Sequence, residues 1–175
     1  MKAPKISTRL SRRRWLVIGL SVGALIGLGL SGQPQNPPSL IYNASPSVPI
    51  GHYFVAPVRE LETGDLVVAR LPQAARELAD ERRYVPATVP VLKHVAAIGG
   101  DAVCAMDADI RINGKQVAKR RERDRLNRPL PWWRSCRQLR SDEVFLLNTA
   151  APDSFDSRYF GPVSLDHVIG KARPL

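Results

Sequence analysis

A single lysine interrupts an apolar run in the middle of the chain. Lys93 stands in the stretch VPVLKHVAAIGGD, where burial would desolvate its ammonium group, lower its pKa and leave a neutral amine at about neutral pH. Such an amine can take the proton of a serine hydroxyl and turn the serine into a nucleophile. The same pattern also fits a lysine on the wet face of a half-buried strand, and periodicity alone favours that interpretation.

A serine between two prolines is the second candidate. Ser47 lies between Pro46 and Pro49 in the stretch YNASPSVPIGHY, which is rich in turn-forming residues. A plain turn is the simplest interpretation. The prolines would also stiffen the loop and keep it out of regular strand pairing, which would present Ser47 at the edge of a cleft.

The charge of the chain is concentrated at its N-terminus. The 175 residues carry a net charge of +10, and they are enough for one domain with an appendage. Six basic residues and no acid fall within residues 1–14, which leaves 20 basic against 16 acidic residues elsewhere. A balance of +4 in the remainder argues against a nucleic-acid partner.

The basic tail is followed by an uncharged apolar run. A helix over residues 15–30 would span about 24 Å, and residues 31–32 could extend it toward the roughly 30 Å of a bilayer core. By the positive-inside rule we predict a cytoplasmic tail (1–14), a transmembrane signal anchor (15–32) and a periplasmic body, in a single-pass protein of the inner membrane. A cleaved signal peptide has the same charged and apolar regions and remains an alternative.

The rest of the chain predicts a mostly β domain. Residues 33–39 form a Pro-rich linker, and the globular domain is expected over residues 40–175. Short strand-like segments follow one another closely, and Asn113-Gly114 lies between two alternating runs, which indicates a hairpin. One short helix-compatible segment occupies residues 72–86.

Cysteine and histidine usage limits the possible site chemistry. Cys104 and Cys136 are an even pair that favours one disulfide in an exported domain, with two unrelated thiols as the alternative. The three histidines are scattered, so no zinc site is predicted and no cofactor is implied. The basic run over residues 119–128 suggests a solvated insertion, or a contact with anionic lipid headgroups.

Four segments, in order, resemble the signal peptidase I family of membrane-anchored serine–lysine peptidases. They are SPSVPIG, GDLVV, LKHVAAIGGD and SFDSRYFGPV, within residues 43–163. The resemblance is closest to the TraF-type conjugative transfer branch, whose members mature pilins. Two departures from the housekeeping pattern are the single residue between Ser47 and Pro49 and the Gly-Gly-Asp turn after the lysine segment.

The resemblance implies a role for each matching residue. Ser47 matches the nucleophile, Lys93 the general base, and Ser45 a hydroxyl that completes the oxyanion hole with the Ser47 N–H. Ser154 matches a serine that hydrogen-bonds the lysine. The last motif also implies a pair of Asp156 with Arg158 that holds its turn in place, or is purely structural.

The resemblance further implies a fold and a function. We expect a signal-peptidase-like β-barrel or β-sheet domain behind one transmembrane helix, which cleaves exported precursors after small residues. The conjugative branch implies a pilin precursor as substrate, with cyclisation of the product as an option. A housekeeping signal peptidase and an inert periplasmic scaffold module of a secretion or conjugation apparatus are the alternatives.

Overall fold

The computed structural model describes residues 15, 17–21 and 40–175. Residues 15 and 17–21 are helical and exposed. The predicted tail and linker, and most of the predicted anchor, lie outside the described residues. Among the residues that are described, no helix has the length and apolar character needed to cross a bilayer.

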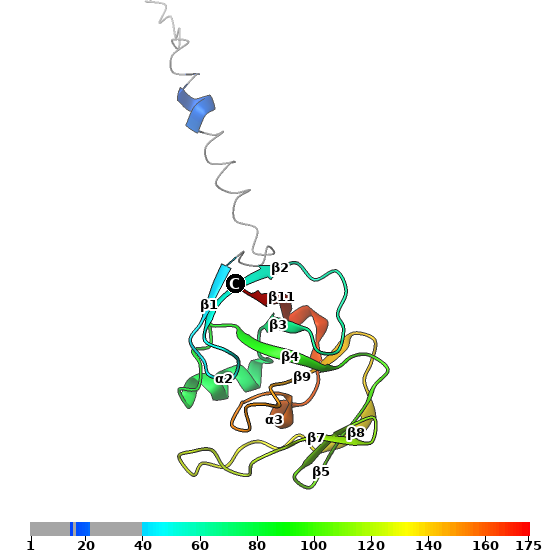
Figure 1. Cartoon of the computed structure of the whole chain (residues 1–175). Helices are drawn as coiled ribbons and strands as arrows, with labels where there is room; N and C mark the ends of the chain where they lie inside the picture. Colours follow the sequence, from blue (N-terminus) through cyan, green and yellow to red (C-terminus); the bar gives the residue numbers. More distant parts are fainter. Residues whose placement is uncertain (1–14, 16, 22–39) are drawn as a thin grey trace, which may run out of the picture. The chain divides into compact units, whose positions relative to one another are not determined.

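Two antiparallel sheets form the domain that follows (Figure 1). The larger has the strand order β1-β2-β11-β3-β4-β9-β10, and the smaller has the order β7-β6-β5-β8. The strands are β1 Leu40–Asn43, β2 Gly51–Ala56, β3 Leu66–Ala69, β4 Val91–Ala97, β5 Ala102–Met106, β6 Asp109–Ile112, β7 Lys115–Lys119, β8 Ser135–Gln138, β9 Glu143–Leu147, β10 Val163–Ser164 and β11 Val168–Pro174. The helices are α2 Gln73–Glu81, α3 Ser157–Phe160 and the 3-10 turn η1 Leu165–His167.

The mostly β prediction is confirmed, but the sheets do not close into a barrel. Within residues 40–175 the larger sheet ends at β1 and β10 without pairing between these two strands. Of the two forms expected from the sequence, the open sheet is therefore the right one.

Predictions that depend only on neighbouring residues, such as turns and a short helix, are confirmed. The hairpin β6–β7 turns at Asn113 (φ 49°) and Gly114 (φ 80°), the left-handed conformation that the Asn-Gly pair favours. Helix α2 falls within the predicted segment. Gly99 lies so close to the 140–141 backbone that an added Cβ would be 2.7 Å from the Ser141 Cα, so the Gly-Gly turn after β4 needs glycine there.

Strand β9 joins the two sheets through the core. All five of its residues are buried, as expected for a strand covered on both faces. Phe145 and Leu147 pack against Val103 and Ile110 of the small sheet, whereas Val144 and its neighbours on the other face pack against β3 and β4. Both β4 and the segment after β9 are thereby held in the centre of the domain.

Three short strands were not predicted from the sequence. These are β1, β8 and β10. Strand β8 has a polar sequence and forms because it pairs with β5, where Cys136 lies directly opposite Cys104. The structure joins these two cysteines in a disulfide across the pair.

Candidate active site

Lys93 is buried, and this decides between the two interpretations of its pattern. It is the third residue of β4, only 4% exposed, whereas the next residue, His94, is exposed on the other face. The Lys93 amine donates a hydrogen bond to the Ser154 hydroxyl at 2.6 Å. This pair was anticipated from the resemblance.

Burial lowers the pKa of Lys93 from 10.5 to about 8. The negative charge of Asp156 opposes this shift, and the positive charge of Arg158 adds to it. Asp156 is itself paired with Arg158, and no carboxylate of residues 40–175 forms a salt bridge with Lys93. A neutral amine is therefore accessible just above neutral pH.

Asp156 and Arg158 form a fully buried ion pair. The Arg158 Nη2 lies 2.7 Å from the Asp156 Oδ2, and both side chains are at most 2% exposed. Asp156 also caps α3 by accepting from the Arg158 N–H. The guanidinium donates in addition to the carbonyls of four residues outside the pair: Asn148, Ala151, Pro152 and Lys119. Hydrogen bonds to Arg158 thus hold the segment between β9 and α3, and that segment carries Ser154.

The basic run is attached to the same segment. Arg121 and Arg125 both form salt bridges with Asp153, the residue before Ser154, at 2.9 and 2.7 Å. The Arg121 N–H donates to the Tyr159 hydroxyl. Part of the run is exposed as expected, but these contacts brace the loop that holds Ser154, a role that the sequence did not indicate.

Ser47 lies in a loop, residues 44–50, that joins β1 to β2 and is called the serine loop below. Asn43 organises this loop: its Oδ1 accepts from the Ser45 N–H, and its Nδ2 donates to carbonyls of Ser45, Val48 and Pro49 at 2.8–3.2 Å. Such Asx hydrogen bonds replace strand pairing in a turn.

The two serines of the loop contact each other. The Ser45 Oγ is 3.1 Å from the Ser47 Oγ, and it accepts from the Ser47 N–H at 3.4 Å. The two groups expected to form the oxyanion hole are therefore adjacent. In this state they hydrogen-bond one another.

The serine loop is connected to β4 through the apolar core. Val48 belongs to the same cluster as Leu92, the residue that directly precedes Lys93 on β4. Within residues 40–175 no hydrogen bond joins Ser47 to Lys93. The structure thus brings Lys93 to Ser154 and Ser47 to Ser45, but it does not show a closed dyad.

Two asparagines of this region were missed in the sequence. Asn43 and Asn148 are both buried and make several hydrogen bonds each. Asn43 starts the motif with Ser47, and Asn148 ends the apolar run of β9. The available signal was a polar amide at the end of a strand or directly after it.

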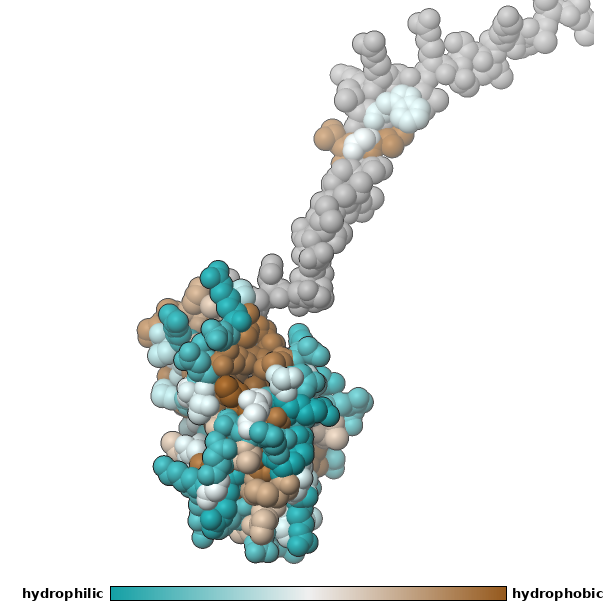
Figure 2. Space-filling model, turned by 90° about the vertical axis from the view of Figure 1, so that its right-hand side faces the viewer, coloured by the Kyte–Doolittle hydropathy of each residue, from teal (hydrophilic) through white to brown (hydrophobic). Residues whose placement is uncertain are grey.

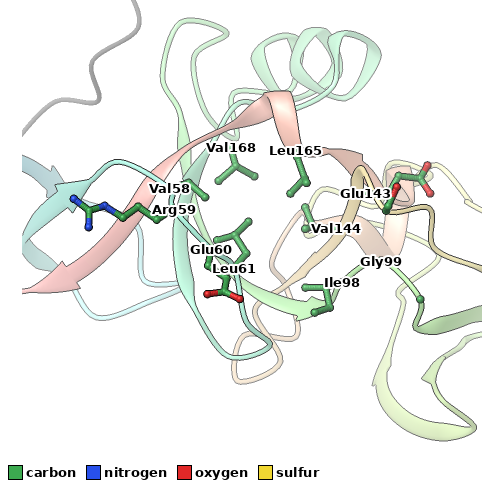
Figure 3. Close-up of a pocket in the computed structure, with 12 residues that line it drawn as sticks. Val58, Arg59, Glu60, Leu61, Ile98, Gly99, Glu143, Val144, Leu165 and Val168 are labelled. Atoms are coloured by element: carbon green, nitrogen blue, oxygen red, sulfur yellow. The ribbon is translucent and has the colours of Figure 1, made fainter.

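A cavity of about 580 Å³ lies apart from these residues (Figure 3). Its walls come from the segment after β2, the far end of β4 and the residues around η1, and include Leu61, Ile98 and Val168. Figure 2 shows apolar side chains gathered in a hollow of the domain surface. None of the predicted site residues lines the cavity.

A comparison with models of protein families identifies the family of this chain. The model described as signal peptidase, peptidase S26 matches residues 12–175. The chain belongs to the peptidase S26 family. A buried lysine on a strand and a serine in a proline-flanked loop are thus observed in a chain of a peptidase family.

Relatives of this S26 family member include proteins of plasmid transfer. Two sequences named plasmid transfer protein TraF, from Escherichia coli, are 33% and 34% identical over 145 residues, 76% of this chain and 80% of each relative. A probable conjugal transfer protein TraF from Sinorhizobium fredii is 28% identical over 97% of this chain and 93% of its own length. A crystal structure of a signal peptidase I from Enterococcus faecalis aligns over 65% of this chain and 97% of its own, with 19% identity and a TM-score of 0.39.

Proposed function

We propose that this protein is a serine endopeptidase in which Ser47 is the nucleophile and Lys93 the general base. The observation that carries the proposal is the burial of Lys93: its amine has a lowered pKa and hydrogen-bonds the neutral Ser154 hydroxyl. A lysine in this state can act as a base, whereas a solvated lysine is protonated.

The chemical steps follow from the atoms available. The neutral Lys93 amine takes the proton of the Ser47 Oγ, and the oxygen attacks the scissile carbonyl of the substrate. The Ser47 N–H and the Ser45 hydroxyl turn from each other to the developing oxyanion. The intermediate collapses to an acyl-enzyme, and the leaving amine departs with the proton from Lys93. Water, or an amine of the substrate, then releases the product.

Substrate binding must complete the dyad. Catalytic hydrogen bonds are often long in a substrate-free enzyme and tighten in the complex. The serine loop is anchored by the buried Val48 and by Asn43, while Ser47 itself is partly exposed. We infer that a peptide laid across the loop moves the Ser47 hydroxyl to the Lys93 amine.

The proposed substrate is an exported precursor protein with small residues before the cleavage site. The names of the TraF relatives favour a substrate of the conjugation apparatus, and we propose a pilin precursor, with head-to-tail cyclisation as one way to resolve the acyl-enzyme. The basic tail and the apolar run at residues 15–32 support attachment to the inner membrane with the catalytic domain in the periplasm.

Precursor processing by the full chain in detergent tests the proposal. A pilin precursor and a general secretory precursor are incubated with the wild-type protein, and the products are followed by mass spectrometry, which separates linear from cyclic forms. Cleavage of the pilin alone supports the proposal, and cleavage of both substrates favours a housekeeping signal peptidase. Cleavage of neither favours an inert scaffold.

Two variants test the dyad. Ser47→Ala and Lys93→Arg are expected to abolish processing, because the first removes the nucleophile and the second cannot deprotonate. Ser141→Ala and Lys115→Arg change exposed residues and are the matched controls. Wild-type activity should rise with pH through about 8, as Lys93 loses its proton. Near-normal processing by a folded Lys93→Arg protein would rule out Lys93 as the base.

A further inference from the structure

Asn148 binds the backbone of β4 on both sides of Lys93. It directly follows β9 and is 2% exposed. Its Nδ2 donates to the Leu92 carbonyl at 3.1 Å, and its Oδ1 accepts from the His94 N–H at 3.2 Å. One amide group therefore holds the two residues that flank the lysine.

The Asn148 side chain replaces backbone hydrogen bonds at the point where the pairing of β4 with β9 ends. The last pair of this ladder is His94 with Leu147, so the register would place Asn148 opposite Lys93. The backbone of Asn148 turns away instead and its side chain reaches β4. The Leu92 carbonyl needs a donor and the His94 N–H needs an acceptor, and the side-chain amide of Asn148 supplies both. A carboxylate in its place would put a second acceptor against the Leu92 carbonyl.

The backbone of Asn148 is bound to the buried ion pair. Its N–H donates to the Asp156 Oδ2 at 3.1 Å, and its carbonyl accepts from the Arg158 Nη2 at 3.1 Å. Asp156 and Arg158 are the two charges that act on Lys93. Asn148 thus links the strand that carries the lysine to the segment that carries both charges and Ser154.

We propose that Asn148 is a positioning residue, which locks the β4 backbone around Lys93 to the Ser154–Asp156 segment and so fixes where the lysine amine points. The inference rests on the proposed function, because it is Lys93 as a base that needs this placement. A misplacement of about 1 Å can cost on the order of a hundredfold in rate. Asn148→Ala should therefore lower kcat about 10- to 100-fold, with KM within about twofold.

The isosteric variant Asn148→Asp tests whether residue 148 lies within electrostatic reach of the lysine amine. It places a carboxylate beside the backbone of Lys93, where the neighbouring charged and titratable groups are Asp156, Arg158 and the His94 ring, whose Nδ1 is 3.2 Å from the Asn148 Oδ1. A new negative charge favours the protonated amine, so the midpoint of the pH–activity profile should rise by about one pH unit. Asn127→Asp, an exposed exchange of the same type in the basic run, should leave the midpoint unchanged.

Titration of the lysine itself separates this inference from the proposed function. The full-length protein with ¹³C-labelled lysine is titrated by NMR in detergent, and the Lys93 signal is assigned from its absence in Lys93→Met. If Asn148→Ala, which introduces no charge, shifts the Lys93 midpoint while the wild-type protein cleaves nothing, the positioning role stands and the peptidase function fails. If the wild-type protein cleaves but Asn148→Ala changes neither kcat nor the Lys93 midpoint and only lowers the melting temperature, the positioning role is overturned.

Discussion

The serine loop and the lysine surroundings are both organised by a buried asparagine, but they are built for different exposure. Asn43 makes its hydrogen bonds within the serine loop, and Ser47 remains partly open to solvent. Lys93 is instead surrounded by groups from several segments, which Asn148 and Arg158 connect through buried hydrogen bonds.

This difference fits the roles proposed for the two residues. The proposed nucleophile has to meet a peptide that arrives from outside, so its side chain must stay reachable from solvent. A lysine base must be kept out of water, because solvation would restore its ordinary pKa and its charge. In the proposed mechanism, the buried surroundings of Lys93 set its protonation state, and the open serine loop admits the substrate.

Breaking the buried ion pair should give the largest effect. Asp156→Ala leaves Arg158 buried without its partner, which costs about 3–5 kcal/mol of unfolding free energy. Urea unfolding followed by circular dichroism measures this. Asp153→Ala removes a carboxylate that binds two exposed arginines, and it should cost less than about 1 kcal/mol. Equal losses in the two variants would contradict the picture of a rigid, buried lysine environment.

In the serine loop the expected effect is on rate, not on stability. Ser45→Ala removes one proposed donor to the oxyanion, which should lower kcat about 10- to 1000-fold. The hydroxyl is exposed and bonded only to Ser47, so the unfolding free energy should change by less than about 0.5 kcal/mol. Processing assays and urea unfolding on the same preparation check both parts. An unchanged kcat would remove Ser45 from the proposed oxyanion hole.

The burial of Lys93 should lower the stability of the protein. A pKa of about 8 in place of 10.5 corresponds to a loss of about 3 kcal/mol of unfolding free energy. This loss is complete below about pH 8, where the folded protein carries a protonated lysine, and it disappears as the pH rises to 10.5. Lys93→Met removes this cost but leaves the Ser154 hydroxyl without its partner, so we expect a net gain of roughly 1–3 kcal/mol at pH 7.

Unfolding at two pH values checks the sign of this effect. The advantage of Lys93→Met should shrink at pH 10, where the folded wild-type protein carries a neutral lysine. Lys115→Met, at an exposed position, should show neither the gain nor its pH dependence. A destabilised Lys93→Met protein at pH 7 would mean that the ammonium is better solvated than its burial indicates.

A modest loss of stability is expected from Asn43, the asparagine that holds the open serine loop. Asn43→Ala removes a donor from carbonyls in a loop that water can partly reach, so the loss of unfolding free energy should be about 1 kcal/mol. Limited proteolysis should show faster cleavage within residues 44–50, since the loop loses its internal hydrogen bonds. A loss as large as that of Asp156→Ala would show that both halves of the site are equally rigid.

The sequence was sufficient where the signal is local or carried by a motif. Turn chemistry predicted the hairpin at Asn113-Gly114, and the succession of short strands predicted a mostly β domain. The order of four motifs led to the family that the comparisons show. These features depend on neighbouring residues or on residue identity, both of which the sequence contains.

The tertiary structure decided what depends on distant segments. Periodicity favoured a solvated Lys93, because a strand pattern cannot tell which face a second layer covers; the segment after β9 covers it and brings Ser154 to the amine. The open form of the larger sheet, the polar strand β8, the brace from Arg121 to Asp153 and the hydrogen bonds of Asn148 likewise depend on pairings between distant residues. Burial and hydrogen-bond partners are properties of the packed chain, and they set the charge state on which the proposed chemistry depends.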